Sequence, residues 1–206
     1  MTTWNDISGN VDSGDIFLFH GPGLESEIIE DVDGTPFSHI ALGVRLPGHQ
    51  HPLLWTSDEI TTLTDQLDHG KRSGVHLLDA KSVFELCMKR RYSNGKHYRF
   101  AWRRLHVDRN ARFMKALEDF MRDVDGRAFP SLEEMAAQFA EGKLDIGTNT
   151  RTFYCSELAT DTYVHLGLLP ADTLINSLSP GDFSSSNRLP LQSGATLDRE
   201  LWFTLD

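Results

Sequence analysis

The sequence lacks long hydrophobic runs and is poor in basic residues. No apolar stretch approaches the roughly 20 residues needed to cross a bilayer, so we expect no transmembrane segment. The segment Met1 to Asp6 has neither a basic start nor an apolar core, and we expect no secretory signal. The formal net charge is -10, with 20 Lys and Arg against 30 Asp and Glu. This charge repels phosphate backbones and anionic lipid surfaces, so we expect no nucleic-acid partner.

Cysteine is almost absent, since the chain has only Cys87 and Cys155. This count excludes a disulfide framework and leaves open a single bond between the two. Cys87 lies on the same side of a predicted helix as Val83 and Phe84, which favours a small buried hydrophobic residue. We therefore expect a cytoplasmic protein, in a reducing compartment that keeps Cys155 a free thiol.

The pattern of apolar residues predicts one α+β domain. A chain of 206 residues with 39% hydrophobic content can bury one sizeable core, so we expect a single domain over 1–206, with a helical insertion at roughly 80–141. The first predicted strand is short and apolar, and we expect it near the centre of a mainly antiparallel sheet packed against helices. The predicted strands are 15–20, 39–46, 52–57, 74–78, 96–105 and 197–205, of which the second and third form a hairpin. The predicted helices are 24–32, 80–91, 109–124 with Asp108 as its N-cap, 131–141 and 155–166.

One thiol stands where an apolar segment passes into the last predicted helix, in the sequence Phe153-Tyr154-Cys155-Ser156-Glu157-Leu158. At a helix N-terminus, unpaired backbone N–H groups and the helix dipole lower the pKa of a thiol and can hold a developing oxyanion. A free cysteine is also commonly a buried structural residue. The motif favours the first interpretation, and we expect Cys155 to be a nucleophile with a lowered pKa.

A histidine that could partner this thiol lies far upstream. His39 begins a run typical of a buried strand, in the segment Thr35-Pro36-Phe37-Ser38-His39-Ile40-Ala41-Leu42-Gly43-Val44. Such a position holds an imidazole at the rim of a sheet, where it can act as a base. His20 ends the first predicted strand before Gly21-Pro22-Gly23, at a second possible rim. The pair His49-Gln50-His51 lacks the converging ligands of a metal site, and we expect no metal and no cofactor.

Three short motifs resemble those of a known group of enzymes. They are Ser13-Gly14-Asp15-Ile16-Phe17-Leu18-Phe19, then Ser38-His39-Ile40-Ala41-Leu42-Gly43-Val44, and finally the Cys155 segment with Gly167-Leu168-Leu169 downstream. Together they are similar to the circularly permuted NlpC/P60-type papain-like cysteine hydrolases, in which the histidine precedes the cysteine. The group also takes in proteins similar to lecithin:retinol acyltransferase.

The resemblance implies a papain-like fold with a thiolate nucleophile at Cys155, a base at His39 and an acyl-enzyme intermediate. It also implies hydrolysis or transfer of an amide or ester, with an oxyanion site made of backbone N–H groups near Cys155. The candidate oxyanion and substrate-binding residues are Tyr154, Ser156, Ser38 and His20.

The sequence departs from the group at the third catalytic position. There a polar residue, often Glu, follows on the strand after the histidine strand, whereas here the nearest position in Leu53-Leu54-Trp55-Thr56-Ser57-Asp58-Glu59 carries Thr56. Alternation along a strand puts Thr56 and Asp58 on one face and Ser57 and Glu59 on the other, so all four stay open as the orienting group. Because a hydroxyl stabilises imidazolium less than a carboxylate does, Thr56 in this role predicts a slow or specialised enzyme.

We expect a cysteine hydrolase that cleaves an amide bond in a small-molecule or peptide substrate, as a peptidase (thiol protease) or amidase. Two alternatives stay open. The first is an acyltransferase or lipid esterase that uses the same two residues, with a lipid as partner, and an apolar groove beside Cys155 would favour it. The second is a catalytically silent binding domain, which the absence of Glu at the Thr56 position favours.

Overall fold

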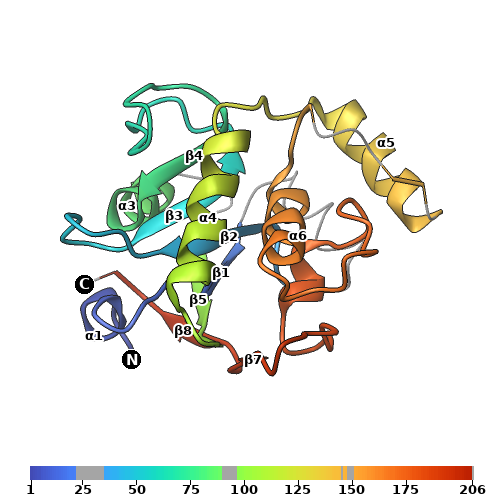
Figure 1. Cartoon of the computed structure of the whole chain (residues 1–206). Helices are drawn as coiled ribbons and strands as arrows, with labels where there is room; N and C mark the ends of the chain where they lie inside the picture. Colours follow the sequence, from blue (N-terminus) through green and yellow to red (C-terminus); the bar gives the residue numbers. More distant parts are fainter. Residues whose placement is uncertain (22–34, 90–96, 145, 148–150, 206) are drawn as a thin grey trace.

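The structure is a computed structural model that describes residues 1–21, 35–89, 97–144, 146–147 and 151–205. Its centre is a six-stranded antiparallel sheet with the strand order β4-β3-β2-β1-β5-β8 (Figure 1). The predicted α+β class and antiparallel sheet are confirmed. The strands are β1 (Ile16–His20), β2 (His39–Val44), β3 (Leu53–Asp58), β4 (Gly74–Asp79), β5 (Arg99–Arg103) and β8 (Leu201–Phe203).

The first strand lies inside the sheet, as its apolar sequence predicted. β1 pairs with β2 on one side, where Phe17 is opposite Ala41, and with β5 on the other, where Phe17 is opposite Trp102. β2 and β3 form the predicted hairpin. Because four of the five β1 side chains are buried, this strand has no solvent-facing side, and its continuous apolar sequence follows from that.

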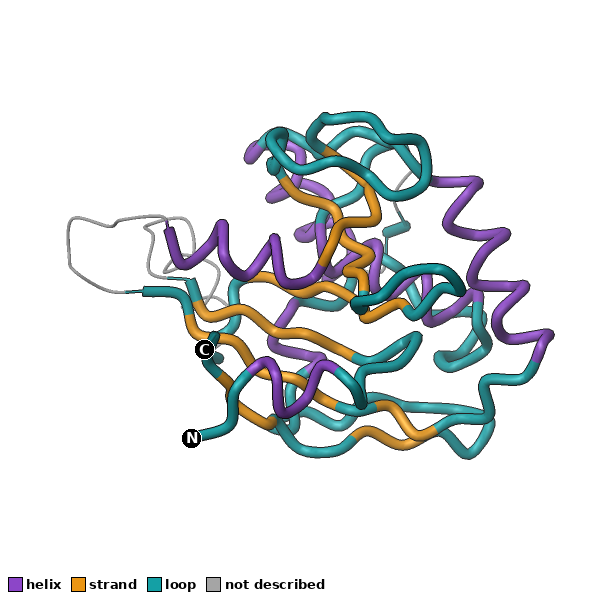
Figure 2. Tube along the Cα trace, turned by 90° about the vertical axis from the view of Figure 1, so that its left-hand side faces the viewer, coloured by secondary structure: helices purple, strands orange, loops and turns teal. Residues whose placement is uncertain are grey.

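Helices cover both faces of the sheet (Figure 2). α4 (Ala111–Val124) and α6 (Cys155–His165) pack on one face, and α1 (Trp4–Ser8) and α3 (Ala80–Lys89) pack on the other. Alternation along the strands divides the apolar side chains between two clusters. The α4 and α6 side includes Ile16, Leu18, Ile40, Leu42, Trp55, Leu117 and Leu158, and the α1 and α3 side includes Trp4, Phe17, Phe19, Leu54, Phe84, Cys87 and Phe100.

Side-chain caps fix where two of the helices begin. In α4 the N-cap is Asn110, whose side chain accepts a hydrogen bond from the N–H of Phe113, so the predicted cap at Asp108 is wrong by two residues. α5 (Leu132–Lys143) begins after Ser131, whose hydroxyl accepts from the N–H of Glu134, as the sequence predicted.

The carboxylate before β1 is buried in a network of donors, which we call the Asp15 network and define as Asp15, Trp102, Leu105 and Arg109. Asp15 Oδ1 accepts from the N–H of Leu105 at 2.9 Å and from Arg109 Nη2 at 3.0 Å, and Oδ2 accepts from Trp102 Nε1 at 2.9 Å. Gly14 has φ +89°, and a Cβ on it would lie 2.8 Å from Leu105. The Ser13-Gly14-Asp15 motif therefore fixes the entry of the chain into β1.

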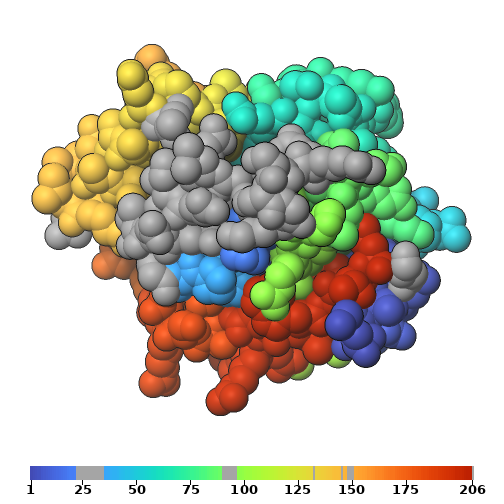
Figure 3. All heavy atoms as spheres, turned by 180° about the vertical axis from the view of Figure 1, so that it is seen from behind, coloured from blue at the N-terminus to red at the C-terminus, as the bar shows by residue number. Residues whose placement is uncertain are grey.

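The two ends of the described chain meet at one edge of the molecule. Thr3 forms a parallel bridge with Thr204, next to the edge strand β8, and Figure 3 shows N-terminal and C-terminal segments side by side on the far face. Two shorter strands, β6 (Leu105–His106) and β7 (Thr196–Leu197), pair separately. None of the described helices is long and apolar enough to cross a bilayer.

The predicted insertion at 80–141 holds α3, α4 and most of α5, and also β5, which pairs with β1 and β8. The single-domain assignment over 1–206 stays a prediction. The predicted helix 24–32 falls outside the described residues, as does the end of the predicted helix 80–91.

Candidate active site

Cys155 is the first residue of α6, as its sequence context predicted. Two side-chain hydrogen bonds tie this helix and the segment before it to β3. Ser57 Oγ donates to the carbonyl oxygen of Phe153 at 2.6 Å, and Trp55 Nε1 donates to Thr162 Oγ1 at 3.2 Å. The first bond holds the segment before α6 against the sheet, and the second holds the C-terminal half of the helix.

The sheet opens where α6 begins. β2 and β3 pair through three residues each, Leu42 to Val44 with Leu53 to Trp55, whereas the beginning of β2 pairs with β1, for example at His39 opposite Phe19. The beginning of β2 and the end of β3 therefore diverge. We call this place the fork and define it by His39, Thr56, Asp58 and Cys155.

The thiol of Cys155 lies at the fork among backbone donors. The N–H groups of Ile40, of Ser156 and of Cys155 itself are directed at the sulfur. Ile40 adjoins His39 in the chain, so the thiol and the imidazole are carried to the same end of β2. Neither cysteine is in a disulfide, and the two lie in the apolar clusters on opposite faces of the sheet.

Burial decides the protonation state of this thiol. Cys155 is 9% exposed, and burial raises its pKa to about 12, although the N–H groups of Ile40 and Ser156 act in the opposite direction. The negative charge of Asp58 raises the pKa further. The predicted lowering of the Cys155 pKa is therefore wrong, because removal of water from the thiolate outweighs the donors at the helix end. At neutral pH the sulfur carries its proton.

His39 is neutral for the same reason. Burial lowers its pKa below 6.5, the negative charge of Asp58 raises it, and the positive charge of His76 lowers it. The ring packs edge-on against Phe19 with a centroid separation of 5.0 Å. His39 Nε2 lies 2.9 Å from Thr56 Oγ1, so the hydroxyl holds the orientation of the ring.

The four candidates for the third position have separate environments. Thr56 is buried and bonded to His39. Ser57 faces the opposite side of the sheet and binds the Phe153 carbonyl, and Glu59 is exposed. Asp58 lies on the same face of β3 as Thr56, and its Oδ1 accepts from His76 Nε2 at 3.0 Å and from the N–H of Ile60 at 2.7 Å.

The candidate substrate-binding residues have partners that fix them within the fold. Tyr154 donates its hydroxyl proton to the carbonyl oxygen of Asn176 at 3.0 Å. Ser38 Oγ accepts from the N–H of Gly21 at 3.2 Å, and His20 Nδ1 lies 2.8 Å from the carbonyl oxygen of Pro36. Ser156 is buried beside Cys155, and its hydroxyl has no hydrogen-bond partner among the described residues. The Ser156 hydroxyl is therefore enclosed by the fold, and none of the four side chains is shown to face a ligand.

The structure adds His76 to the site, which the sequence pattern did not single out. His76 lies on β4 directly opposite Thr56, and its side chain is 1% exposed. Its Nδ1 lies 3.2 Å from the carbonyl oxygen of Arg72, while its Nε2 faces Asp58. No local motif marks this residue, because its position depends on the register between two strands joined by a long loop.

Three carboxylates come together away from the fork. Within the part of the chain that the structure describes, Asp65, Asp68 and Asp125 bring their oxygens within 4.8 Å of one another. The guanidinium of Arg72 contacts all three, at 3.3, 2.6 and 3.0 Å. Burial raises the pKa of Asp125 to about 7, and repulsion from Asp65 adds to this effect. The cluster is thus occupied by a side-chain cation, and it fits a metal ion poorly.

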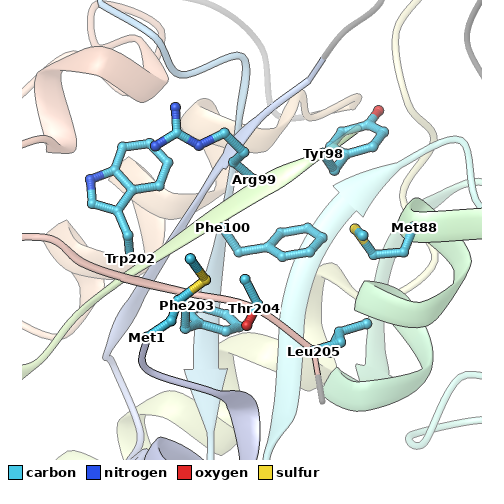
Figure 4. A pocket seen from close by; sticks show the side chains of 9 residues that line it. All are labelled: Met1, Met88, Tyr98, Arg99, Phe100, Trp202, Phe203, Thr204 and Leu205. Atoms are coloured by element: carbon cyan, nitrogen blue, oxygen red, sulfur yellow. The ribbon is translucent and has the colours of Figure 1, made fainter. Parts of the chain in front are cut away.

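An apolar pocket of about 270 Å³ opens on the α1 and α3 side of the sheet, at the β5–β8 edge (Figure 4). The guanidinium carbon of Arg99 lies 4.3 Å from the ring centroid of Trp202 at the mouth of this pocket. Phe100 in its wall is 5.4 Å from Phe19, and Phe19 is the ring that packs on His39. The lining residues are Met1, Met88, Tyr98, Arg99, Phe100, Trp202, Phe203, Thr204 and Leu205.

Comparison with known proteins gives a match in fold. No protein-family model matches the sequence, and no curated protein matches it significantly. Among solved structures the fold is similar to the metalloprotein yiiX from Escherichia coli O157:H7, of the group DUF1105, with a TM-score of 0.51 and 14% sequence identity. The match covers 76% of this chain and 66% of yiiX, just under two thirds of that protein's length. The chain therefore shares the α+β fold of yiiX.

Proposed function

We propose that this chain is a cysteine hydrolase of the circularly permuted papain-like type, which cleaves an amide bond as a peptidase or amidase. The observation that carries the proposal is the position of the Cys155 sulfur at the start of α6, where it accepts from the N–H of Ile40, the residue that follows His39 in β2. This position supports a thiol, backbone donors and an imidazole that act together at the fork. These are the groups that acyl transfer to sulfur requires.

The pKa directions define how the reaction begins. Because the Cys155 thiol and the His39 ring are both neutral at pH 7, the proton leaves sulfur as the S–C bond forms. With Nε2 donating to Thr56, Nδ1 of His39 is the nitrogen that takes this proton. The π electrons of the substrate carbonyl move onto its oxygen, and the N–H groups at the start of α6 stabilise the negative charge.

The remaining steps follow from the same groups. The C–N bond breaks, and the departing amine takes the proton from His39, which leaves a thioester on Cys155. Water then gives its proton to His39 and attacks the thioester carbon. The acid leaves, and the proton returns from His39 to the sulfur.

The apolar pocket favours a second candidate, the acyltransferase or lipid esterase. Its wall is separated from His39 by the single ring of Phe19. An apolar cavity that has the Arg99 guanidinium among its lining groups suits an acyl chain that ends in a polar or anionic group. The same thiol and imidazole would then act on an ester, and the acceptor alcohol or water would release the acyl group from sulfur.

Covalent labelling tests the proposal. Incubation with peptidyl and fatty-acyl electrophiles, followed by intact mass measurement, is expected to add one label per chain on Cys155. Cys155→Ser abolishes this label, and the matched control Cys87→Ser retains it. Preference for the peptidyl probe supports the peptidase or amidase, and preference for the fatty-acyl probe supports the second candidate. Equal labelling of Cys155 in the native and His39→Ala proteins, or no labelling, contradicts the enzyme and favours a binding domain.

A further inference from the structure

Thr56 supplies no negative charge to stabilise a protonated His39. During the proposed reaction His39 becomes an imidazolium, and the hydroxyl bonded to its Nε2 is uncharged. A neutral partner orients the ring and stabilises its positive charge weakly. Another group must supply the negative charge if the protonated ring is to form readily.

Asp58 lies where it can supply this charge. It is two residues after Thr56 on β3, so both side chains are on the same face of the strand as the ring of His39. The Asp58 side chain is 14% exposed, so water screens its field only partly. Burial acts to raise the pKa of Asp58, but the hydrogen bond and charge of His76, together with the charge of His39, lower it below the ordinary value. Asp58 is therefore ionised at neutral pH.

His76 forms a hydrogen bond with the carboxylate of Asp58. Both ring nitrogens of His76 face oxygens that can only accept, the carbonyl of Arg72 at 3.2 Å and the ionised carboxylate of Asp58 at 3.0 Å. An imidazole satisfies two acceptors only when both nitrogens carry hydrogen, which is the cationic form. With Asp58 ionised, these two contacts make His76 an imidazolium bonded to Asp58.

We propose that Asp58 and His76 form a buried ion pair that controls the protonation of His39, with Asp58 supplying the negative charge that Thr56 lacks. Asp58 is a positioning residue that acts on His39 through space, and His76 fixes its carboxylate and offsets part of its charge. The inference rests on the proposed function only in taking His39 as the base. After attack the sulfur is an uncharged thioether, so Asp58 has no thiolate to repel there, and its charge favours the protonated form of His39.

The surrounding charges are arranged consistently with this role. Burial acts to lower the pKa of His76, but the hydrogen bond and charge of Asp58 raise it above 6.5. The negative charge of the nearby Asp65 adds to this effect. Asp65 is itself paired with Arg72, which also binds two further carboxylates. The titratable and charged groups that face the pair are His39 from β2, Asp65 and Arg72 from the loop before β4, and Cys155 from α6.

The test is a pH titration of the histidine Cε1–H signals by NMR, with signals assigned from the His39→Gln and His76→Gln spectra. Asp58→Asn is expected to lower the pKa of His39 by about one unit, because it removes the negative charge that favours the protonated ring. His76→Gln is expected to raise it, because Gln keeps a donor to Asp58 and carries no charge. The exposed neighbour Glu59 provides the matched control, and Glu59→Gln leaves the pKa of His39 unchanged.

Opposite shifts in the two variants support the ion pair, since loss of packing alone gives no such sign reversal. Shifts in the same direction, or no shift on Asp58→Asn, overturn it. If Asp58→Asn does not fold, Asp58→Ser, which retains an acceptor for the N–H of Ile60, takes its place, and His76→Gln decides independently. The titration uses no substrate, so a protein that fails the labelling test can still show the Asp58–His76 ion pair. If the protein is labelled but the two variants do not shift the pKa of His39, the ion pair is refuted and the proposed function stands.

Discussion

Asp15 and Asp58 are both carboxylates carried into the interior of the same sheet, and their surroundings differ. Asp15 accepts four hydrogen bonds across its two oxygens, from Asp12, Trp102, Leu105 and Arg109. Asp58 accepts two, and both reach Oδ1. Burial raises the pKa of Asp15, whereas the bond and charge of His76 bring that of Asp58 below its ordinary value despite burial.

The difference separates a structural network from a reactive one. In the Asp15 network every acceptor site is used, so the carboxylate joins β1 to the start of α4 and has nothing left to offer a ligand. At the fork, the sulfur of Cys155 and the second nitrogen of His39 retain capacity for proton transfer. A buried charge therefore marks stability in the Asp15 network, and in our proposal it marks chemistry at the fork, where its partners satisfy it less fully.

Removal of the base is the change expected to have the largest effect at the fork. His39→Ala leaves no group to take the Cys155 proton, and we expect labelling by an acyl electrophile at pH 7 to slow by about 100-fold or more. The rate of probe addition, measured by mass spectrometry, checks this. His97→Ala removes a histidine that lies outside the fork and serves as the control. A loss of less than threefold, by contrast, would remove His39 from the reaction, since about 0.6 kcal/mol is too small for a general base.

Removal of the structural carboxylate is expected to act on stability instead. Asp15→Ala removes the acceptor of the Trp102 N–H and the buried carboxylate paired with Arg109, whose guanidinium then keeps only the carbonyl oxygens of Ser13 and Leu105 and the more distant Asp12. We expect it to lower the free energy of unfolding by about 3 kcal/mol or more. Asp12→Ala removes a carboxylate whose side chain is 46% exposed and should cost less than about 1 kcal/mol. Urea unfolding measures both. Similar losses in the two variants would show that the network is not the stabilising element.

The pH dependence of thiol alkylation distinguishes a neutral Cys155 thiol beside neutral His39 from a Cys155 thiolate beside a His39 imidazolium. With the pKa of Cys155 raised to about 12, its thiolate fraction grows by about tenfold for each pH unit below that value, so the alkylation rate should rise steadily from pH 7 to pH 10. Iodoacetamide on the Cys87→Ser protein reports Cys155 alone. A plateau reached below pH 8 would show a thiolate already stabilised by His39 and contradict the neutral pair.

The smallest effect is expected at Thr56. Thr56→Val removes the hydroxyl at nearly constant volume, and loss of one hydrogen bond to His39 should slow probe labelling by about fivefold. Thr56→Ser retains the hydroxyl and should restore most of the rate. If both variants slow labelling equally, the contribution of Thr56 comes from packing and the ring is oriented by other groups.

Much of the fold could be read from local pattern. Continuous apolar runs predicted β1, β2 and β4, and helical spacing predicted α3 and α4. The apolar face of α3 also correctly predicted that Cys87 is buried. The start of α6 at Cys155 was also predicted, because an apolar segment ends there and a helical one begins. The cap of α4 was misplaced because Asp108 and Asn110 are equally good caps in sequence, and only the backbone chooses between them.

The sequence by itself determined most of the described helices and strands, with Cys155 at a helix start and His39 at a strand start. It also determined that a hydroxyl, and not a carboxylate, stands at position 56. Each of these features depends on neighbours in the chain. Tertiary structure alone decided the charge state of the site. Burial of the sulfur and imidazole, and the pairing register that carries His76 to Asp58, arise from segments distant in sequence. Electrostatic free energies depend on distance and solvent access in space, and for that reason the pattern of residues predicted the reverse of the actual shift at Cys155.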